Sequence, residues 1–139
     1  AADGYTVFDL DVDFHSTYGC SIMPGNYIDF YFKAIDDDNF VMFGKFIESL
    51  KVTKVVDKDG NDVFALDDDT KAPKPAKLYF IVPREYNDLL RKALLISSNN
   101  IEIIPVPRNA GYSENPKETQ IVNEEIENFV LSKSVYIAG

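Results

Sequence analysis

Residues 8–14 read FDLDVDF, and the strict alternation of apolar and acidic residues in this stretch constrains the fold more than any other feature of the sequence. Successive side chains of a β-strand point to opposite faces of a sheet. The pattern therefore predicts a half-buried strand over residues 5–14, with one core face and one solvent face. The core face would carry Phe8, Leu10, Val12 and Phe14, and the solvent face Asp9, Asp11 and Asp13.

A metal site is the alternative reading of these three aspartates. Alternate side chains of an extended strand lie roughly 6.5–7 Å apart. The oxygen ligands of one Ca²⁺ must converge within about 5 Å of each other, because each lies about 2.3–2.6 Å from the ion. We therefore interpret the aspartates as the solvent face of the strand, where like charges also discourage edge-to-edge pairing.

Five further stretches have the composition of β-strands, and turn residues separate them. They cover residues 27–35, 40–56, 63–66, 77–82 and 101–107. The long stretch 40–56 is either one strand or two, with Gly44 as a candidate bulge. Pro24-Gly25-Asn26, the run at 36–39 and DKDGND at 57–62 are turns, and residues 67–77 form a polar loop. Pro105 places the last strand at a sheet edge or end.

Two stretches show the period of an amphipathic helix. In residues 84–98 one apolar stripe contains Tyr86, Leu89, Leu90, Ala93, Leu94 and Ser97. Residues 119–133 repeat this period, with Thr119 as the expected N-cap; this helix either packs on the β-rich unit or extends away from it. We expect an α+β fold, a curled and mostly antiparallel sheet with one packed helix and a C-terminal helix. The expected division is a β-rich domain over 1–108 and a loop with an amphipathic helix over 109–139.

Composition excludes several classes of function. Hydrophobic residues make up 45% of the 139 residues, and the formal net charge is −9. Phosphate binding needs clustered Lys and Arg, and no basic run exists, so we expect no nucleic-acid partner. No apolar run approaches the roughly 20 residues that span a bilayer, so we expect no direct membrane insertion by this segment.

The acidic turn DKDGND is the stronger candidate for Ca²⁺. Asp57, Asp59 and Asn61 match positions 1, 3 and 5 of an EF-hand loop, and Asp68 would be position 12. However, the glycine falls at position 4 instead of 6, and the flanks are strand-like. A hairpin turn favours Asp-Gly in any case, so we interpret the segment as a turn and expect no metal site.

Catalytic motifs are missing from the sequence. His15 is the only histidine and Cys20 the only cysteine. A Cys-His nucleophile pair is conceivable, but no third orienting residue can be named for it. No phosphate-binding loop or nucleophile elbow is present. We therefore expect no catalytic residues, no cofactor and a non-enzymatic protein.

Three motifs resemble the Flp pilus assembly protein CpaB/RcpC family. The first is the Pro-Gly turn and following strand at residues 24–30, PGNYIDF; the second is ESLKVTKVVD at residues 48–57; the third is the strand-helix unit AKLYFIVPREYNDLLRKAL at residues 76–94. The resemblance covers residues 4–108. Asn26 and Tyr27 depart from the Asp and the basic residue that are usual in the first motif.

The resemblance implies an accessory role in Flp/Tad-type pilus assembly or secretion, through contacts with other pilus-assembly proteins. It also implies a relation to SAF domains of the β-clip type. The chain would be extracytoplasmic, tethered to the cytoplasmic membrane by an anchor that this chain does not include. SAF-type domains bind sugars elsewhere, so a carbohydrate- or cell-wall-binding module is the alternative function. Tyr18, Tyr31 and Tyr112 are the aromatic residues that would then be expected on one concave face.

Overall fold

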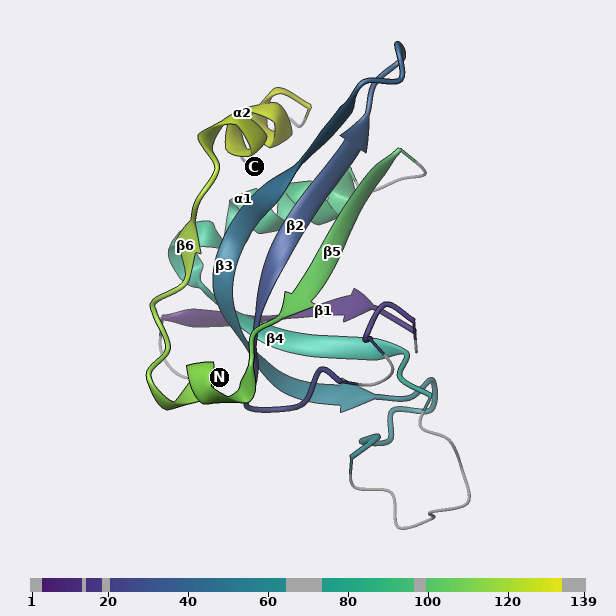
Figure 1. The fold of residues 1–139 in the computed structure, drawn as a ribbon, viewed down its shortest axis with the longest axis vertical. Coiled ribbons are helices and arrows are strands. Elements are labelled where there is room, and N and C mark those ends of the chain that lie inside the picture. Colours follow the sequence, from purple (N-terminus) through teal and green to yellow (C-terminus); the bar gives the residue numbers. More distant parts are fainter. Residues whose placement is uncertain (1–3, 14, 19–20, 65–73, 97–99, 134–139) are drawn as a thin grey trace, which may run out of the picture.

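The computed structural model describes residues 4–13, 15–18, 21–64, 74–96 and 100–133, which form a curled open sheet with two helices (Figure 1). The strands are β1 (Tyr5–Asp11), β2 (Tyr27–Ile35), β3 (Val41–Val56), β4 (Lys77–Pro83), β5 (Ile101–Pro107) and β6 (Gln120–Ile121). The helices are α1 (Asn87–Leu95) and α2 (Glu124–Ser132), with 3-10 turns η1 (Arg84–Tyr86) and η2 (Ala110–Glu114). The expected mixed class with an antiparallel sheet is confirmed.

The strand order is β1-β4-β3-β2-β5, every neighbouring pair is antiparallel, and β6 adds to β3. Strand β3 holds the two parts of the sheet together, because its first half pairs with β2 and its second half with β4. Figure 1 shows β3 curving so strongly that β2 and β5 run obliquely to β1 and β4. The sheet therefore wraps around its own core.

Bulges in β3 explain this curvature. The register against β2 shifts twice, between Ile28 and Phe30 and between Phe30 and Tyr31. Ser49 lies at the first shift with a positive φ of 64°. Extra residues on one strand bend it and increase its twist. The predicted bulge at Gly44 is wrong, because Gly44 pairs in regular register with Phe32.

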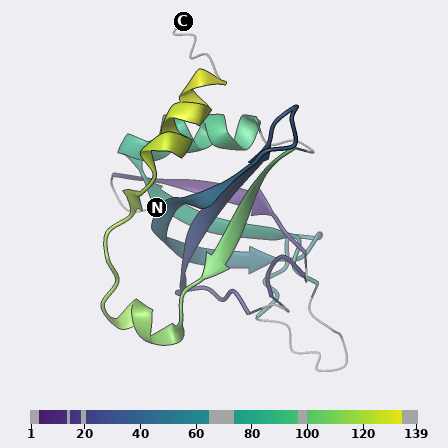
Figure 2. The ribbon, with the colours of Figure 1, turned by 45° about the horizontal axis from the view of Figure 1, so that its top comes forward.

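The concave face of the sheet and the two helices enclose one hydrophobic core. Both helices contribute to it: α1 buries Leu90 and Ala93, and α2 buries Ile126 and Val130. The two helices contact each other, and Figure 2 shows them side by side at the same end of the sheet. The C-terminal helix thus packs on the β-rich unit. The largest fully buried side chains on the strands are Phe8, Phe30, Phe32, Phe46, Phe80, Ile28, Ile47, Leu50 and Leu78.

Strand β1 has the orientation that the opening motif predicts. Phe8 is buried, Leu10 and Val12 pack partly buried against the core, and Asp9, Asp11 and Asp13 are exposed. Phe14 lies outside the described residues. The regular strand ends at Asp11, and Asp13 instead joins a turn with Ser16: its carboxylate accepts the Ser16 N–H at 2.7 Å. This hydrogen bond is the main reason that the pKa of Asp13 is lowered.

The predicted N-cap of the C-terminal helix and one predicted strand are wrong. The N-cap of α2 is Asn123, whose Oδ1 accepts the N–H of Ile126 at 3.1 Å. Thr119 instead donates its hydroxyl to the Ser49 carbonyl, and residues 120–121 pair with β3. The strand predicted at 63–66 does not form at Val63 and Phe64, which turn away after a single bridge between Val56 and Asp62. Residues 65–66 lie outside the described part of the chain.

Substituting Gly44 tests the packing of α2 on β3. A Cβ at this position would lie 3.0 Å from Nδ2 of Asn123 and 3.4 Å from Cδ1 of Ile126. In a strand interior Gly→Ala usually stabilises, because glycine is destabilising there by about 0.5–1 kcal/mol. We expect the reverse here: Gly44→Ala should lower the urea midpoint by pushing the cap of α2 off β3. An unchanged or raised midpoint would mean that Asn123 and Ile126 leave room for a Cβ at residue 44, and would contradict the prediction.

Candidate protein-binding face

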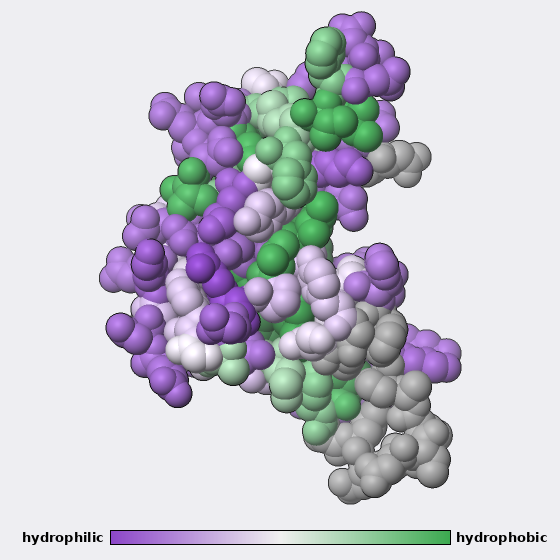
Figure 3. Space-filling view, viewed as in Figure 1, coloured by the Kyte–Doolittle hydropathy of each residue, from purple (hydrophilic) through white to green (hydrophobic). Residues whose placement is uncertain are grey.

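An apolar band crosses the outer face of β3, β2 and β5, opposite the core. Cross-strand register places Ile35 beside Val41, and Tyr31 beside Ile104. The ring of Phe43 stacks on that of Tyr31, with centroids 5.5 Å apart and an interplanar angle of 23°. We call these five residues the apolar band. In Figure 3 apolar surface gathers near the β2–β3 hairpin and continues obliquely down this face.

Two residues of the band are mostly exposed, and the other three, Tyr31, Ile35 and Ile104, are half-buried. Phe43 is 60% exposed and Val41 is 58% exposed, and Phe40 at the adjoining hairpin tip is 73% exposed. Single exposed apolar residues are common, but several gathered on one rigid element mark an interaction site. Aromatic side chains offer the largest contact area for such a site.

The hairpin that carries the band is held by a local turn. The Asp36 carboxylate accepts the N–H groups of Asp38 and Phe40, both at 2.9 Å. Asn39 takes a positive φ of 64°, which asparagine tolerates better than most residues. The turn therefore orients the hairpin and presents Phe40, Val41 and Phe43 to solvent.

Charged residues interrupt the band. Lys33 lies between Phe43 on β3 and Glu102 on β5, and Lys45 lies beside Tyr31. All three charged residues share the outer face with the band. A partner surface would therefore need apolar contacts together with charges of both signs.

A buried polar network lies on the same outer face of the sheet as the band. It lies near the start of β2, away from the β2–β3 hairpin. Asp29 on β2 is almost completely buried, and its Oδ2 lies 2.8 Å from Nε of Arg108 and 3.6 Å from Nζ of Lys45. The Nε–Oδ2 contact is an ion pair whose angle falls short of a hydrogen bond. Arg108 also donates from Nη2 to Glu48 at 3.1 Å. Burial alone would lower the pKa of Arg108, but the contacts with Asp29, together with the nearby Tyr112 and Glu48, raise it.

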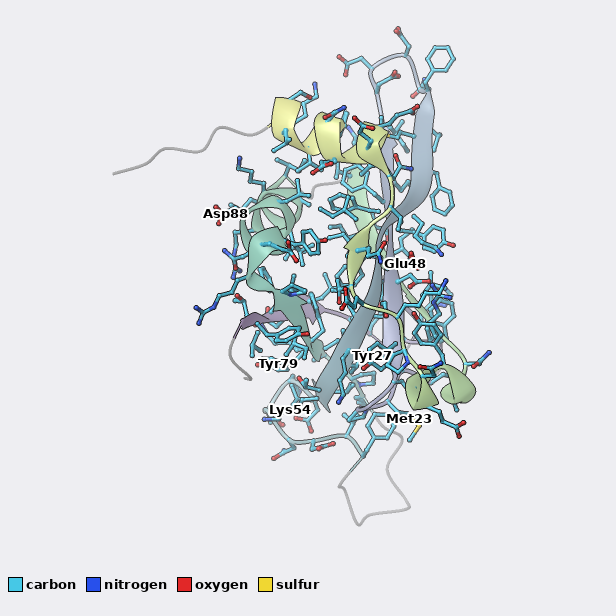
Figure 4. The ribbon with its side chains drawn as sticks, turned by 90° about the vertical axis from the view of Figure 1, so that its left-hand side faces the viewer. Met23, Tyr27, Glu48, Lys54, Tyr79 and Asp88 are labelled. Carbon is cyan, nitrogen blue, oxygen red and sulfur yellow. The ribbon has the colours of Figure 1, made fainter. Side chains whose placement is uncertain are left out.

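Ser49 connects this network to the segment that follows β5. Its N–H donates to Asp29 at 3.0 Å, and its hydroxyl donates to the Lys117 carbonyl at 2.6 Å. Tyr112 donates its hydroxyl to Ser49 Oγ at 3.0 Å, while its ring lies 4.6 Å from the Arg108 guanidinium carbon. Figure 4 shows Glu48 and Tyr27 on the side of the sheet where η2 lies. These hydrogen bonds hold residues 109–121 against β3. They thereby place the start of α2 beside the sheet.

Sequence reasoning missed this network. The available signal was Asp29 itself, a single carboxylate in the otherwise aromatic and aliphatic strand YIDFYFKAI. An unpaired buried carboxylate is strongly unfavourable, so a cationic partner could have been expected. The identity of the partner was not readable, because Arg108 and Lys45 come from other strands or segments.

A groove beside β5 contains the only histidine. Its volume is about 520 Å³, and its polar lining includes Asp11, His15, Ser16, Tyr18 and Glu102. Ser16 is engaged in the turn with Asp13 and offers no activated nucleophile. Cys20 lies outside the described residues, so the structure does not place the Cys-His pair. The groove thus brings His15 together with the carboxylates of Asp11 and Glu102, and its described hydroxyl side chains are those of Ser16 and Tyr18.

Residues 57–62 form the turn that the sequence predicts. The Asp57 carboxylate accepts the N–H groups of Asp59 and Asn61, both at 2.9 Å. The hydrogen bond from the Asn61 backbone is the main cause that lowers the pKa of Asp57. Asp68 lies outside the described residues. Within the part of the chain that is described, no three His, Cys, Asp or Glu side chains are placed to share a metal ion.

The three tyrosines that a sugar site would need lie in three different settings. Tyr18 is exposed in the groove beside β5, and Tyr31 belongs to the apolar band. Tyr112 is held in the network with Ser49. Their separation leaves the apolar band as the feature best suited to binding.

No protein-family model, curated protein or solved structure matches the chain. Neither described helix has the length and apolar character needed to cross a membrane.

Proposed function

We propose that the protein is a non-enzymatic binding domain that serves in Flp/Tad-type pilus assembly or secretion and acts outside the cytoplasmic membrane, to which an anchor tethers it. The exposed apolar band is the observation that carries the binding role. Its partners would be other pilus-assembly proteins. The assignment to the pilus system, and the relation to SAF domains of the β-clip type, rest on the resemblance of three motifs to those of the CpaB/RcpC family.

The three motifs have structural roles in this fold that fit such an assignment. The Pro24-Gly25 turn leads into β2, and the Gly25 N–H donates to the Val52 carbonyl at 2.8 Å. Asp29 in the same motif is the buried carboxylate of the polar network. The second motif forms the bent part of β3, and the third forms β4, η1 and α1. The motifs thus form parts of the sheet and the helix α1, and all five residues of the band lie outside them.

The band predicts the effect of a surface substitution. Phe43→Ser combined with Val41→Ser should weaken binding to the extracytoplasmic domains of pilus-assembly partners by roughly 30-fold or more, since truncated hot-spot residues cost about 2 kcal/mol or more. The urea midpoint should change little, because both side chains are mostly exposed. Binding would be measured by interferometry with each purified partner.

Leu95→Ser is the matched control, because Leu95 is 76% exposed but lies at the end of α1. It should leave binding unchanged. Equal affinity of the band variant and the wild type would refute the role of the band. Normal piliation after deletion of the gene would refute the assignment to pilus assembly.

A further inference from the structure

One end of the sheet is an open strand edge. Strands β1 and β4 are joined by the Arg84 N–H to the Gly4 carbonyl at 2.9 Å, and by the Val12 N–H to the Ala76 carbonyl at 3.0 Å. Hydrogen-bonded and non-hydrogen-bonded pairs alternate along an antiparallel ladder. The odd-numbered residues of β1 therefore direct their N–H and C=O groups away from β4. These residues are Tyr5, Val7, Asp9 and Asp11.

These backbone groups have no hydrogen-bond partner among the described residues. All four residues are exposed, which agrees with an uncovered edge. The strand contains no proline, so each of the four positions retains its N–H donor. Unpaired donors and acceptors in a row are a template for an added strand.

The opposite end of the strand order, β5, is blocked. The Ile35 N–H bonds the Asn100 carbonyl and the Arg108 N–H bonds the Tyr27 carbonyl, both at 2.8 Å. By the same alternation, Pro105 and Pro107 occupy positions whose N–H would point to the free edge, and proline has none. This edge cannot accept a full-length strand, so β1 is the end of the strand order that can.

We propose that β1 binds an extended segment of a partner protein as an additional antiparallel strand. The segment carries basic side chains opposite Asp9 and Asp11 and apolar side chains opposite Tyr5 and Val7. Main-chain hydrogen bonds supply the affinity of such a complex, and alternate side chains supply its specificity. This interface is distinct from the apolar band and goes beyond the proposed function.

Charge argues for a basic partner. Asp9 and Asp11 share one cation, Lys77, whose Nζ lies 4.0 Å and 3.5 Å from their carboxylates. Two carboxylates with one cation leave a negative charge on the outer side of the edge, in a chain of net charge −9. Opposite charges directly across a strand pair stabilise it.

The same charges argue against a second copy of the chain. A symmetric antiparallel pairing centred on Asp9 would place Asp9 against its own copy. A pairing centred on Phe8 would place Asp9 opposite Val7 and leave the Asp9 side chains of the two copies as close diagonal neighbours. A pairing centred on Val7 would place Asp9 opposite Tyr5 and pair only residues 5–9 of the two strands. Like charges across a strand pair are destabilising, so self-pairing is disfavoured in the registers centred on Phe8 and Asp9. The register centred on Val7 forms fewer backbone hydrogen bonds than a partner strand paired along all of β1.

The test uses amide hydrogen exchange measured by NMR on the full chain. The probe is the acetylated, amidated peptide Lys-Thr-Lys-Thr-Val-Thr-Val, with the peptide Glu-Thr-Glu-Thr-Val-Thr-Val as its charge-reversed control. We expect fast exchange at Val7, Asp9 and Asp11 in the free protein, and exchange slowed by roughly tenfold or more with saturating basic peptide. The acidic peptide should have no effect. Unchanged exchange at these amides with the basic peptide would overturn the proposal.

Val7→Pro removes one edge donor without removing a β1–β4 hydrogen bond, and should abolish the effect of the basic peptide. Asp9→Lys with Asp11→Lys provides a second variant if Val7→Pro does not fold. The double lysine variant should bind the acidic peptide in preference to the basic one. A retained preference for the basic peptide would overturn the proposal. Phe43→Ser should bind the basic peptide as the wild type does. The strand-addition proposal and the proposed binding role of the apolar band can therefore fail independently of each other.

Discussion

Replacing Arg108 with methionine should lower the free energy of unfolding by about 3 kcal/mol, because it leaves the buried carboxylate of Asp29 without its closest cation. Removing one partner of a buried ion pair typically costs about 3–5 kcal/mol. We expect the low end of this range, since Lys45 still lies 3.6 Å from Asp29 and Ser49 still donates to it. Urea denaturation at neutral pH would measure the change.

A double substitution distinguishes two contributions to this loss of stability, the uncompensated buried charge and the lost packing of the Arg108 side chain. Asp29→Asn in the Arg108→Met background should recover part of the lost stability, because it removes the uncompensated charge. Lys77→Met is the matched control, since the exposed pairs of Lys77 with Asp9 and Asp11 should contribute about 0–1 kcal/mol. If Lys77→Met cost as much as Arg108→Met, the network at Asp29 would have no special structural role.

Truncating Ile126 to alanine should lower the free energy of unfolding by about 2–5 kcal/mol, the usual range for a buried Ile→Ala change. Ile126 is 1% exposed and belongs to the same core as the strands. The loss should shift one cooperative transition that β-sheet and helix signals share. Circular dichroism and tyrosine fluorescence during urea unfolding would measure it.

Leu131→Ala on the same helix is the control, since Leu131 is 45% exposed and its truncation should cost much less. If α2 were an independent arm, Ile126→Ala would leave the midpoint of the sheet signal unchanged. Such a result would mean that α2 does not contribute to the stability of the sheet.

Local pattern predicted most of the regular structure. The aromatic and β-branched run at 27–35 predicted β2 with the bounds that the structure has. The 3.6-residue period predicted the buried stripe of α1, including Leu90 and Ala93. Pro105 predicted an edge, and β5 is one. These features were readable because the side-chain period of a strand or helix is a property of adjacent residues.

Errors occurred where a distant segment decides the local conformation. Gly44 was expected to form a bulge, but it pairs regularly with Phe32, and Asn123 and Ile126 of another segment lie close to it. Thr119 was expected to cap a helix, but its hydroxyl bonds the Ser49 carbonyl, and Asn123 takes the role of cap. In both cases a contact across the fold outweighed a plausible local pattern.

The same division applies to the two binding surfaces. The alternation in FDLDVDF by itself determined that β1 has an acidic solvent face, because a strand must alternate. Only the tertiary structure decided that β1 ends the sheet and that its odd-numbered backbone groups have no partner among the described residues. Likewise, the sequence showed Tyr31, Phe43 and Ile104 as apolar residues of three strands, and strand register placed them together on the outer face. Chain order sets the period of a strand, but pairing between distant strands sets which of its faces and edges remain open.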